Sequence, residues 1–248
     1  MQTAGGGAAA TTEAAAVRYN ILGKTLVLRR QPQNHESTGN IVWEAGTVLG
    51  RFLHKQQKKL NVRGKKCLEL GAGCGGVPGM VLALLGAELV FWTDVECVLP
   101  LLRRNVEANV SLLREVGGEG QPRQRLVVQE YAFGEDTAPL LRAMRGKEEG
   151  KEEENDETEE ARTDVFDIIV GSDIVFKSEL VDPLVKSLAE LSDPRTQIFI
   201  ALEVRCETTQ QFFLEQVQKQ FLCKRVRTLF FLPLYSFFVL SSAFYHLS

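Results

Sequence analysis

The sequence lacks the cysteine pattern of a metal centre or of a disulfide framework. It has five cysteines in 248 residues, an odd number, and no two of them stand at C-x-x-C spacing. Zinc sites and disulfide-stabilised domains both depend on cysteines at short or paired spacings. We therefore expect no metal and a reducing compartment, with the cytoplasm as the first prediction and the nucleus as the alternative.

A secretory signal and a dense block of positive charge are also absent. The opening MQTAGGGAAATTEAAA has neither a basic segment nor an apolar one, so a disordered tail is expected over residues 1–17. Negative charge is concentrated in residues 147–160, KEEGKEEENDETEE, with nine acids and two lysines. Such a run predicts a disordered, solvated insertion at about 146–163. The other 27 bases and 23 acids give a mildly basic body, for which we expect no nucleic-acid partner.

Residues 228–245, TLFFLPLYSFFVLSSAFY, carry no charge over eighteen positions. This length reaches the lower limit of a membrane-spanning helix, about 17–25 residues. Pro233, three serines and several phenylalanines favour strands instead. We expect a pair of final strands that complete a sheet, and rank a membrane anchor second.

The rest of the chain alternates short apolar runs with amphipathic stretches, the pattern of an α/β fold. A β-hairpin is predicted at 19–31 and a helix at 44–56. Apolar strands are predicted at 65–71, 87–94, 124–133, 165–173 and 197–204, and helices at 76–86, 98–114, 179–191 and 208–221. Near-continuous apolar strands indicate a mostly parallel sheet with helices on both faces, in a single domain over residues 18–248.

Four glycines follow the first of these strands in CLELGAGCGG, residues 67–76. A glycine-rich turn at the carboxyl end of a parallel strand lets a ligand approach the backbone closely. Gly71, Gly73 and Gly76 satisfy the G-x-G-x-x-G pattern of dinucleotide-binding folds. Glu69 argues against that ligand, because its carboxylate would repel a pyrophosphate and attract a cationic amino-acid cofactor.

Asp94 ends the second predicted strand at the same edge of the sheet. A carboxylate there can accept hydrogen bonds from both hydroxyls of a ribose. NAD and S-adenosylmethionine folds share this feature, so Asp94 indicates an adenosine ribose without choosing between them.

Together these motifs resemble the class I, seven-strand S-adenosylmethionine-dependent methyltransferases. More closely, the chain resembles the methyltransferase-like protein-lysine methyltransferases. The resemblance lies in four ordered segments: TGNIVWEAG (38–46), LELGAGCGGVPGMVLALLGAELVFWTD (68–94), VLPLLRRNVEAN (98–109) and DIIVGSDIVF (167–176). It implies a single Rossmann-like seven-stranded domain with S-adenosyl-L-methionine as cofactor and a protein as substrate.

The resemblance also implies roles for single residues around the cofactor. Trp43 would pack on it, with Glu44 fixing the surrounding segment. Phe133 would cover the adenine, where relatives commonly carry a tryptophan–glycine pair. Asn105 and Asn109 match an N-x-x-x-N stretch, although both could be surface residues. The positions implied to bind the cofactor are Trp43, Glu69, Gly71, Gly73, Gly75, Asp94, Phe133 and Ser172.

On the acceptor side, Ser172 and Asp173 would lie where the target amine meets the methyl group. The family's D-x-x-Y motif reads Asp173-Ile-Val-Phe176 here, so the aromatic ring is kept and the hydroxyl is lost. Asp173 and Phe176 are the implied catalytic residues. Glu203 and Arg205 are expected either to shape the acceptor channel or to form a local ion pair.

Other functions remain open from the sequence. The acceptor could be a histidine, a protein N-terminus or a small molecule, because the glycine turn is blind to the acceptor. A nicotinamide-dependent oxidoreductase and an inert cofactor-binding module are alternatives of other classes. A monomer is expected.

Overall fold

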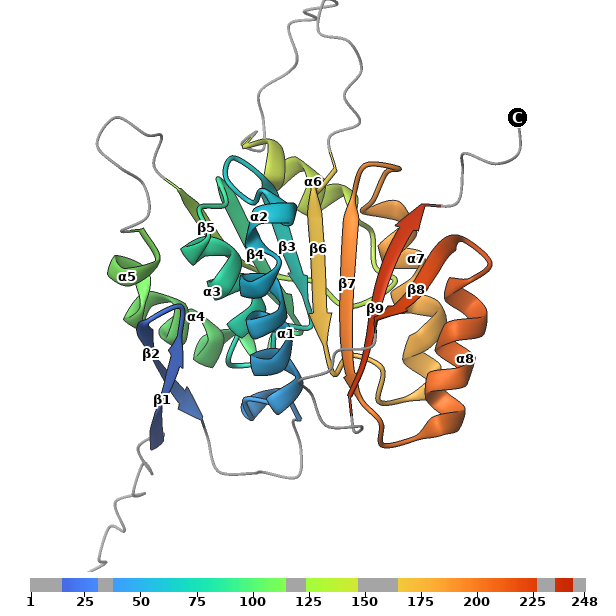
Figure 1. Cartoon of the computed structure of the whole chain (residues 1–248), viewed down its shortest axis with the longest axis horizontal. Helices are drawn as coiled ribbons and strands as arrows, with labels where there is room; N and C mark the ends of the chain where they lie inside the picture. Colours follow the sequence, from blue (N-terminus) through green and yellow to red (C-terminus); the bar gives the residue numbers. More distant parts are fainter. Residues whose placement is uncertain (1–14, 31–37, 115–123, 147–164, 227–234, 243–248) are drawn as a thin grey trace, which may run out of the picture.

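A computed structural model describes residues 15–30, 38–114, 124–146, 165–226 and 235–242. Its centre is a seven-stranded sheet in the order β5-β4-β3-β6-β7-β9-β8 (Figure 1). The five strands β5, β4, β3, β6 and β7 are parallel, whereas β9 pairs antiparallel with both β7 and β8. The predicted Rossmann-like α/β fold is confirmed. The sheet strands are β3 (Lys66–Leu70), β4 (Leu89–Asp94), β5 (Arg125–Glu130), β6 (Ile168–Ser172), β7 (Gln197–Glu203), β8 (Phe221–Val226) and β9 (Tyr235–Ser242).

Helices cover both faces of this sheet (Figure 1). Central strands are mostly apolar because neither face of the sheet meets water. In β3, for example, Leu68, Glu69 and Leu70 are fully buried. One core cluster joins α1, α3 and α4 to the sheet, and the other joins α6, α7 and α8 to its opposite face. The helices are α1 (Glu44–Lys55), α2 (Gln57–Leu60), α3 (Val77–Leu84), α4 (Leu99–Ala108), α5 (Val110–Arg114), α6 (Ala138–Arg145), α7 (Val181–Glu190) and α8 (Glu207–Val217), with short 3₁₀ turns η1 (Thr38–Asn40) and η2 (Ser178–Leu180).

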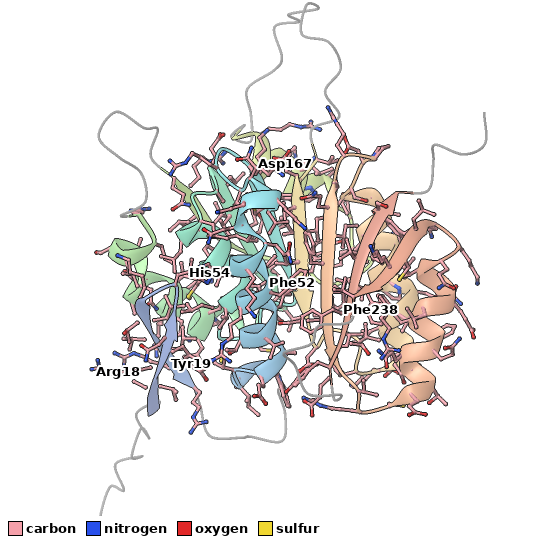
Figure 2. All side chains as sticks on the ribbon, in the orientation of Figure 1. Arg18, Tyr19, Phe52, His54, Asp167 and Phe238 are labelled. Carbon is pink, nitrogen blue, oxygen red and sulfur yellow. The ribbon has the colours of Figure 1, made fainter. Side chains whose placement is uncertain are left out.

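Strand β9 shows how the C-terminal apolar run is used. Consecutive strand residues point to opposite faces, so Phe237 packs on Phe52 of α1, with ring centroids 5.7 Å apart, and Phe238 packs on Phe213 of α8 at 6.2 Å. Figure 2 labels Phe52 and Phe238 on these elements. Within the described residues, the run contributes the strand β9. Two final strands complete the sheet as expected, but the first of them, β8, precedes the run. None of the helices described is long and apolar enough to cross a membrane.

The sequence misplaced some boundaries. The helix expected at 98–114 is divided at Asn109 into α4 and α5. Helix α6 follows β5 where only the acidic loop was expected. Strand β1 begins at Ala15, so three residues assigned to the N-terminal tail belong to the hairpin. Residues 1–14 of that tail, and the acidic insertion from residue 147 on, lie outside the described residues.

The predicted hairpin consists of β1 (Ala15–Ile21) and β2 (Lys24–Arg30) and forms a separate antiparallel pair. Asn105 in α4 and Asn109 at the C-terminal end of this helix hydrogen-bond to the backbone of β2, as a neighbouring strand would. Asn109 accepts from the Val27 N–H at 2.9 Å and donates to its carbonyl at 2.9 Å. Asn105 does the same with Arg29 and also donates to the Cys74 carbonyl in the glycine turn. Both asparagines are buried, which corrects the surface alternative.

We predict that Asn109→Ala lowers the free energy of unfolding by about 1–3 kcal/mol, since it leaves the Val27 N–H and carbonyl without their partner. Urea unfolding measures this change, and hydrogen exchange at Val27 reports it locally. Asn20→Ala is the control, because Asn20 makes an exposed hydrogen bond with Thr25 in the same hairpin. Equal effects of the two substitutions would refute the bridging role.

Candidate functional site

A cavity of about 360 Å³ opens at the carboxyl ends of β3, β4 and β6, the edge toward which the arrow of β6 points in Figure 1. This volume lies within the range of small-molecule sites, about 300–1,000 Å³. It is also the edge where open α/β sheets bind ligands. The predicted residues that line the cavity are Trp43, Gly71, Gly73, Asp94, Phe133, Ser172, Asp173 and Phe176.

Left-handed backbone conformations shape the glycine turn after β3. The φ angles of Gly71, Gly73 and Gly76 are 59°, 58° and 52°, a region that residues with a Cβ rarely adopt. Gly75 has no such angle, and a Cβ there would lie 3.1 Å from Val42. Gly75 therefore makes room for the segment before α1. It lines a smaller cavity of about 30 Å³, which Gly71 and Gly73 of the main cavity also line.

Glu69 lines the same small cavity and is fully buried. Its Oε2 accepts from the Gly79 N–H at 2.7 Å, and its Oε1 has no hydrogen-bond partner among the described residues. Burial raises the pKa of this carboxyl to about 8, although the Gly79 hydrogen bond acts in the opposite sense. Glu69 thus lies behind the turn rather than in the main cavity. Its unpartnered oxygen is a group that a cationic ligand could satisfy.

Asp94 faces the main cavity at the end of β4. Its Oδ2 accepts from the Gly73 N–H at 2.7 Å and its Oδ1 from the Val95 N–H at 2.8 Å. Burial raises the pKa of this carboxyl, and the two hydrogen bonds oppose the rise. Each carboxylate oxygen keeps a further lone pair. The side chain therefore fixes the glycine turn and can still accept two hydroxyl groups.

Phe133 also lines the cavity, from the loop after β5. The loop is held by Ser187 of α7, whose hydroxyl accepts from both the Tyr131 hydroxyl and the Gly134 N–H at 2.8 Å. Tyr131 also lines the cavity and was missed. Phe133, two residues further on, was found only through the family pattern. Nothing in the local sequence distinguishes Tyr131 from an aromatic residue of the core.

Asp173 follows β6 with φ 54°, the left-handed region that aspartate adopts more readily than most residues. Its Oδ1 accepts from the Glu203 N–H at 2.7 Å, and its Oδ2 pairs with Nη2 of Arg205 at 3.3 Å. Burial raises the pKa of Asp173, against the effects of the Glu203 N–H and the Arg205 charge. The guanidinium also pairs with the Glu203 carboxylate. Glu203 and Arg205 therefore form the expected local ion pair, and Arg205 also lines the cavity.

The mouth of the cavity beside Asp173 is partly apolar. Trp43 lies under Arg205, with 4.1 Å from the guanidinium carbon to the ring centroid. The Phe176 side chain is 44% exposed, and Lys177 follows it at the rim. The cavity is therefore lined by two carboxylates. Asp94 can accept hydroxyl groups, and Asp173 lies near the exposed ring of Phe176.

Residues of the loops before α1 and after β4 also line the cavity and were not foreseen. Gly39 of η1 lies against the glycine turn, where its carbonyl accepts from the Cys74 N–H at 2.6 Å. Cys97 and Val98 line the side next to Asp94, and Ile174 lies beside Asp173. Their residue types carry no signal of function, so only the folded chain identifies them.

Comparison with known proteins gives a consistent result. A family model described as lysine methyltransferase matches residues 23–119 and 151–220. The zebrafish protein N-lysine methyltransferase METTL21A is 33% identical over 72% of this chain and 67% of its own length. The EEF1A lysine methyltransferase 3 of Xenopus tropicalis is 28% identical over 73% of this chain and 64% of its own length.

Solved structures share the fold. The T. thermophilus 16S rRNA methyltransferase RsmC, determined with AdoMet and guanosine, superposes with a TM-score of 0.57 at 20% identity, over 93% of this chain and 51% of that one. The magnesium protoporphyrin IX methyltransferase of Synechocystis, determined with SAH, gives 0.50 at 12% identity, over 80% and 83%. At these identities the likeness concerns the fold alone.

The buried Glu69 predicts a pH dependence of stability. Its pKa is about 8 in the folded chain against an ordinary 4.5, so the unfolded chain releases the proton first. The folded state then binds more protons, and its stability falls as pH rises from about 4.5 to about 8. We expect Glu69→Gln to lose this dependence in urea unfolding, whereas Glu88→Gln, at an exposed position, retains it. Parallel stability profiles of Glu69→Gln and wild type would contradict the burial argument.

Proposed function

The chain belongs to the lysine methyltransferase family, and from this premise we propose which of its residues hold the cofactor and which hold the acceptor. As a member, it uses S-adenosyl-L-methionine to methylate the side-chain amine of a protein lysine. The nicotinamide-dependent and inert alternatives are set aside on this ground. The observation that carries the assignment is that Asp94 and Asp173 line the same cavity.

The cofactor end of the cavity offers groups that suit the parts of S-adenosylmethionine. The Asp94 carboxylate accepts the ribose hydroxyls with its remaining lone pairs. Phe133 covers the adenine through its ring face, and Trp43 packs on the cofactor from the opposite side of the mouth. Gly71 and Gly73 line the methionine part. Glu69 lies behind the turn beneath that part, where its Oε1, without a partner among the described residues, can accept a hydrogen bond from an amino group.

When bound, the cofactor supplies a methyl group activated by a positively charged sulfur. The acceptor nitrogen must carry a lone pair, so the lysine has to lose its proton to water at the open mouth. Asp94, Phe133 and Trp43 would hold the cofactor so that it could supply this methyl group to a neutral amine beside Asp173. The protein contributes positioning and exclusion of water, and no covalent enzyme intermediate is needed.

Asp173 orients the acceptor amine. Its carboxylate is held on both sides by Glu203 and Arg205, which fixes the direction in which its remaining lone pairs point. Ser172 lies beside it, and Phe176 offers an apolar wall that disfavours a charged amine. Because Phe176 has no hydroxyl, the hydrogen bond that the family's tyrosine could make is absent here.

A protein N-terminus is the second acceptor that the comparisons favour. A relative from Emericella nidulans, 28% identical over 69% of this chain, is named protein N-terminal and lysine N-methyltransferase efm7. A backbone α-amino group has a pKa of about 7.7–8.0, so it reaches the neutral state more easily than lysine. Histidine and small molecules have no such support.

We propose in addition that the chain acts as a monomer in the cytoplasm, with the nucleus as the alternative, and without a nucleic-acid partner. Its five cysteines are all free, which suits a reducing compartment.

The function is tested by incubating the protein with an extract and tritiated S-adenosylmethionine. We expect a labelled protein band whose label mass spectrometry locates on a lysine side chain. Label on an α-amino group would establish the second acceptor instead. The absence of any labelled protein, with cofactor binding intact by calorimetry, would reject both.

The role of Asp173 is tested by Asp173→Asn. Asparagine tolerates the left-handed φ, so the turn is kept while the charge is lost. We expect kcat to fall about 10²-fold or more, because the amine is no longer aimed, and the affinity for S-adenosylmethionine to stay within a few-fold. Asp182→Asn, an exposed acid at the start of α7, should leave both unchanged. Full turnover by Asp173→Asn would remove Asp173 from the mechanism.

A further inference from the structure

Arg205 lines the acceptor end of the cavity and contacts three residues there, Asp173, Glu203 and Trp43. Its guanidinium pairs with Asp173 at 3.3 Å, pairs with Glu203, and covers the ring of Trp43. The arginine side chain is 41% exposed and that of Asp173 only 7%. Arg205 therefore places a fixed positive charge over a nearly buried carboxylate.

The two carboxylates create a chemical problem for lysine methylation. An opposite charge within about 4–6 Å favours the charged form of a titratable group. Asp173 and Glu203 alone would hold an incoming lysine as ammonium, which has no lone pair. An acceptor site with this charge would bind its substrate tightly and methylate it slowly.

We propose that Arg205 is a positioning residue that offsets the charge of Asp173 and Glu203, so that the lysine bound there gives up its proton before methyl transfer. The inference rests on the proposed place of the amine beside Asp173. The guanidinium is suited to this role because it stays charged at every working pH. The proton leaves to water at the mouth, where Arg205 and Phe176 are both exposed.

The other charged groups around Asp173 do not replace Arg205. Glu44 at the start of α1 adds negative charge and accepts the hydroxyl of Tyr235 from β9, whose pKa burial and Glu44 raise above its ordinary value. Asp94 is a further acid in the same cavity. Lys177, after β6, is the other cation among the described residues that line it. Loss of Arg205 thus leaves an excess of negative charge at the acceptor end.

The test is the pH dependence of kcat, whose acidic limb reports the amine in the enzyme–substrate complex. The acceptor is the protein that wild type labels in the extract, purified and used at saturation. We expect Arg205→Met to move this limb up by at least about one pH unit. Arg205→Lys should keep the limb near its wild-type position, because it retains the charge even where stacking on Trp43 is lost.

Arg195→Met is the matched control. Arg195 forms an exposed ion pair with Asp193 at 2.7 Å in the turn between α7 and β7, and its loss should leave the limb in place. Calorimetry with S-adenosylmethionine and thermal unfolding separate effects on cofactor binding and folding.

The outcomes distinguish this inference from the lysine methylation on which it rests. A uniform drop of kcat in Arg205→Met at every pH, with the limb unmoved, would overturn the charge role and leave lysine methylation standing. An equal shift in Arg205→Lys would also overturn it. If wild type labels no lysine, the function itself fails, and that result needs no variant.

Discussion

The position of the glycine turn depends on close packing beneath it, where Gly79 of α3 meets Glu69 and Trp92. A Cβ on Gly79 would collide with Nε1 of Trp92 and would lie 2.7 Å from Oε2 of Glu69. The absence of that Cβ lets the Gly79 N–H donate to Glu69, while Trp92 donates to the Gly76 carbonyl at 2.9 Å. These two hydrogen bonds join β3, β4 and the start of α3 into one unit. The cavity forms on the outer side of this unit.

The same packing explains the chemistry of the site. Glu69 is enclosed because Trp92 and α3 exclude water, and enclosure raises the pKa of its carboxyl. Asp94 is the last residue of β4, one position after the buried Thr93, and its side chain therefore reaches the cavity. Two carboxylates on the neighbouring strands β3 and β4 therefore differ in role. One supports the turn from inside, and the other meets the ligand.

Much of this fold was predictable because doubly covered strands are almost wholly apolar. Strands β3, β4, β6 and β7 were visible as runs, and the glycines with Asp94 located the cavity edge between them. Helix α6 was missed because it is short, buries only Leu140 and Met144, and is soon followed by the acidic run. The break at Asn109 was missed because the spacing of apolar residues continues across it. In the structure α4 ends before Asn109, whose side chain hydrogen-bonds to Val27 of β2.

The types of residue at the site were predictable from the sequence. The directions in which these residues point in the folded chain were less so. Sequence spacing placed Gly75 beside Gly73, yet the turn sends Gly75 toward Val42. The contact of Arg205 with Asp173 joins residues 32 positions apart, and no local pattern encodes it. The sequence matched Asn105 to a family motif but left a surface position open, and only the folded chain shows that it is buried against the hairpin and the glycine turn.

The left-handed φ of Asp173 limits what evolution or an engineer can place there. A longer acid of equal charge would pay the steric penalty of this conformation, about 1–2 kcal/mol for ordinary side chains, and its carboxylate would reach past the Glu203 N–H. Charge conservation alone is therefore a poor guide at this position. Backbone shape and charge therefore restrict this position together: asparagine and glycine suit the left-handed turn but lack the carboxylate, and glutamate keeps the charge but strains the turn.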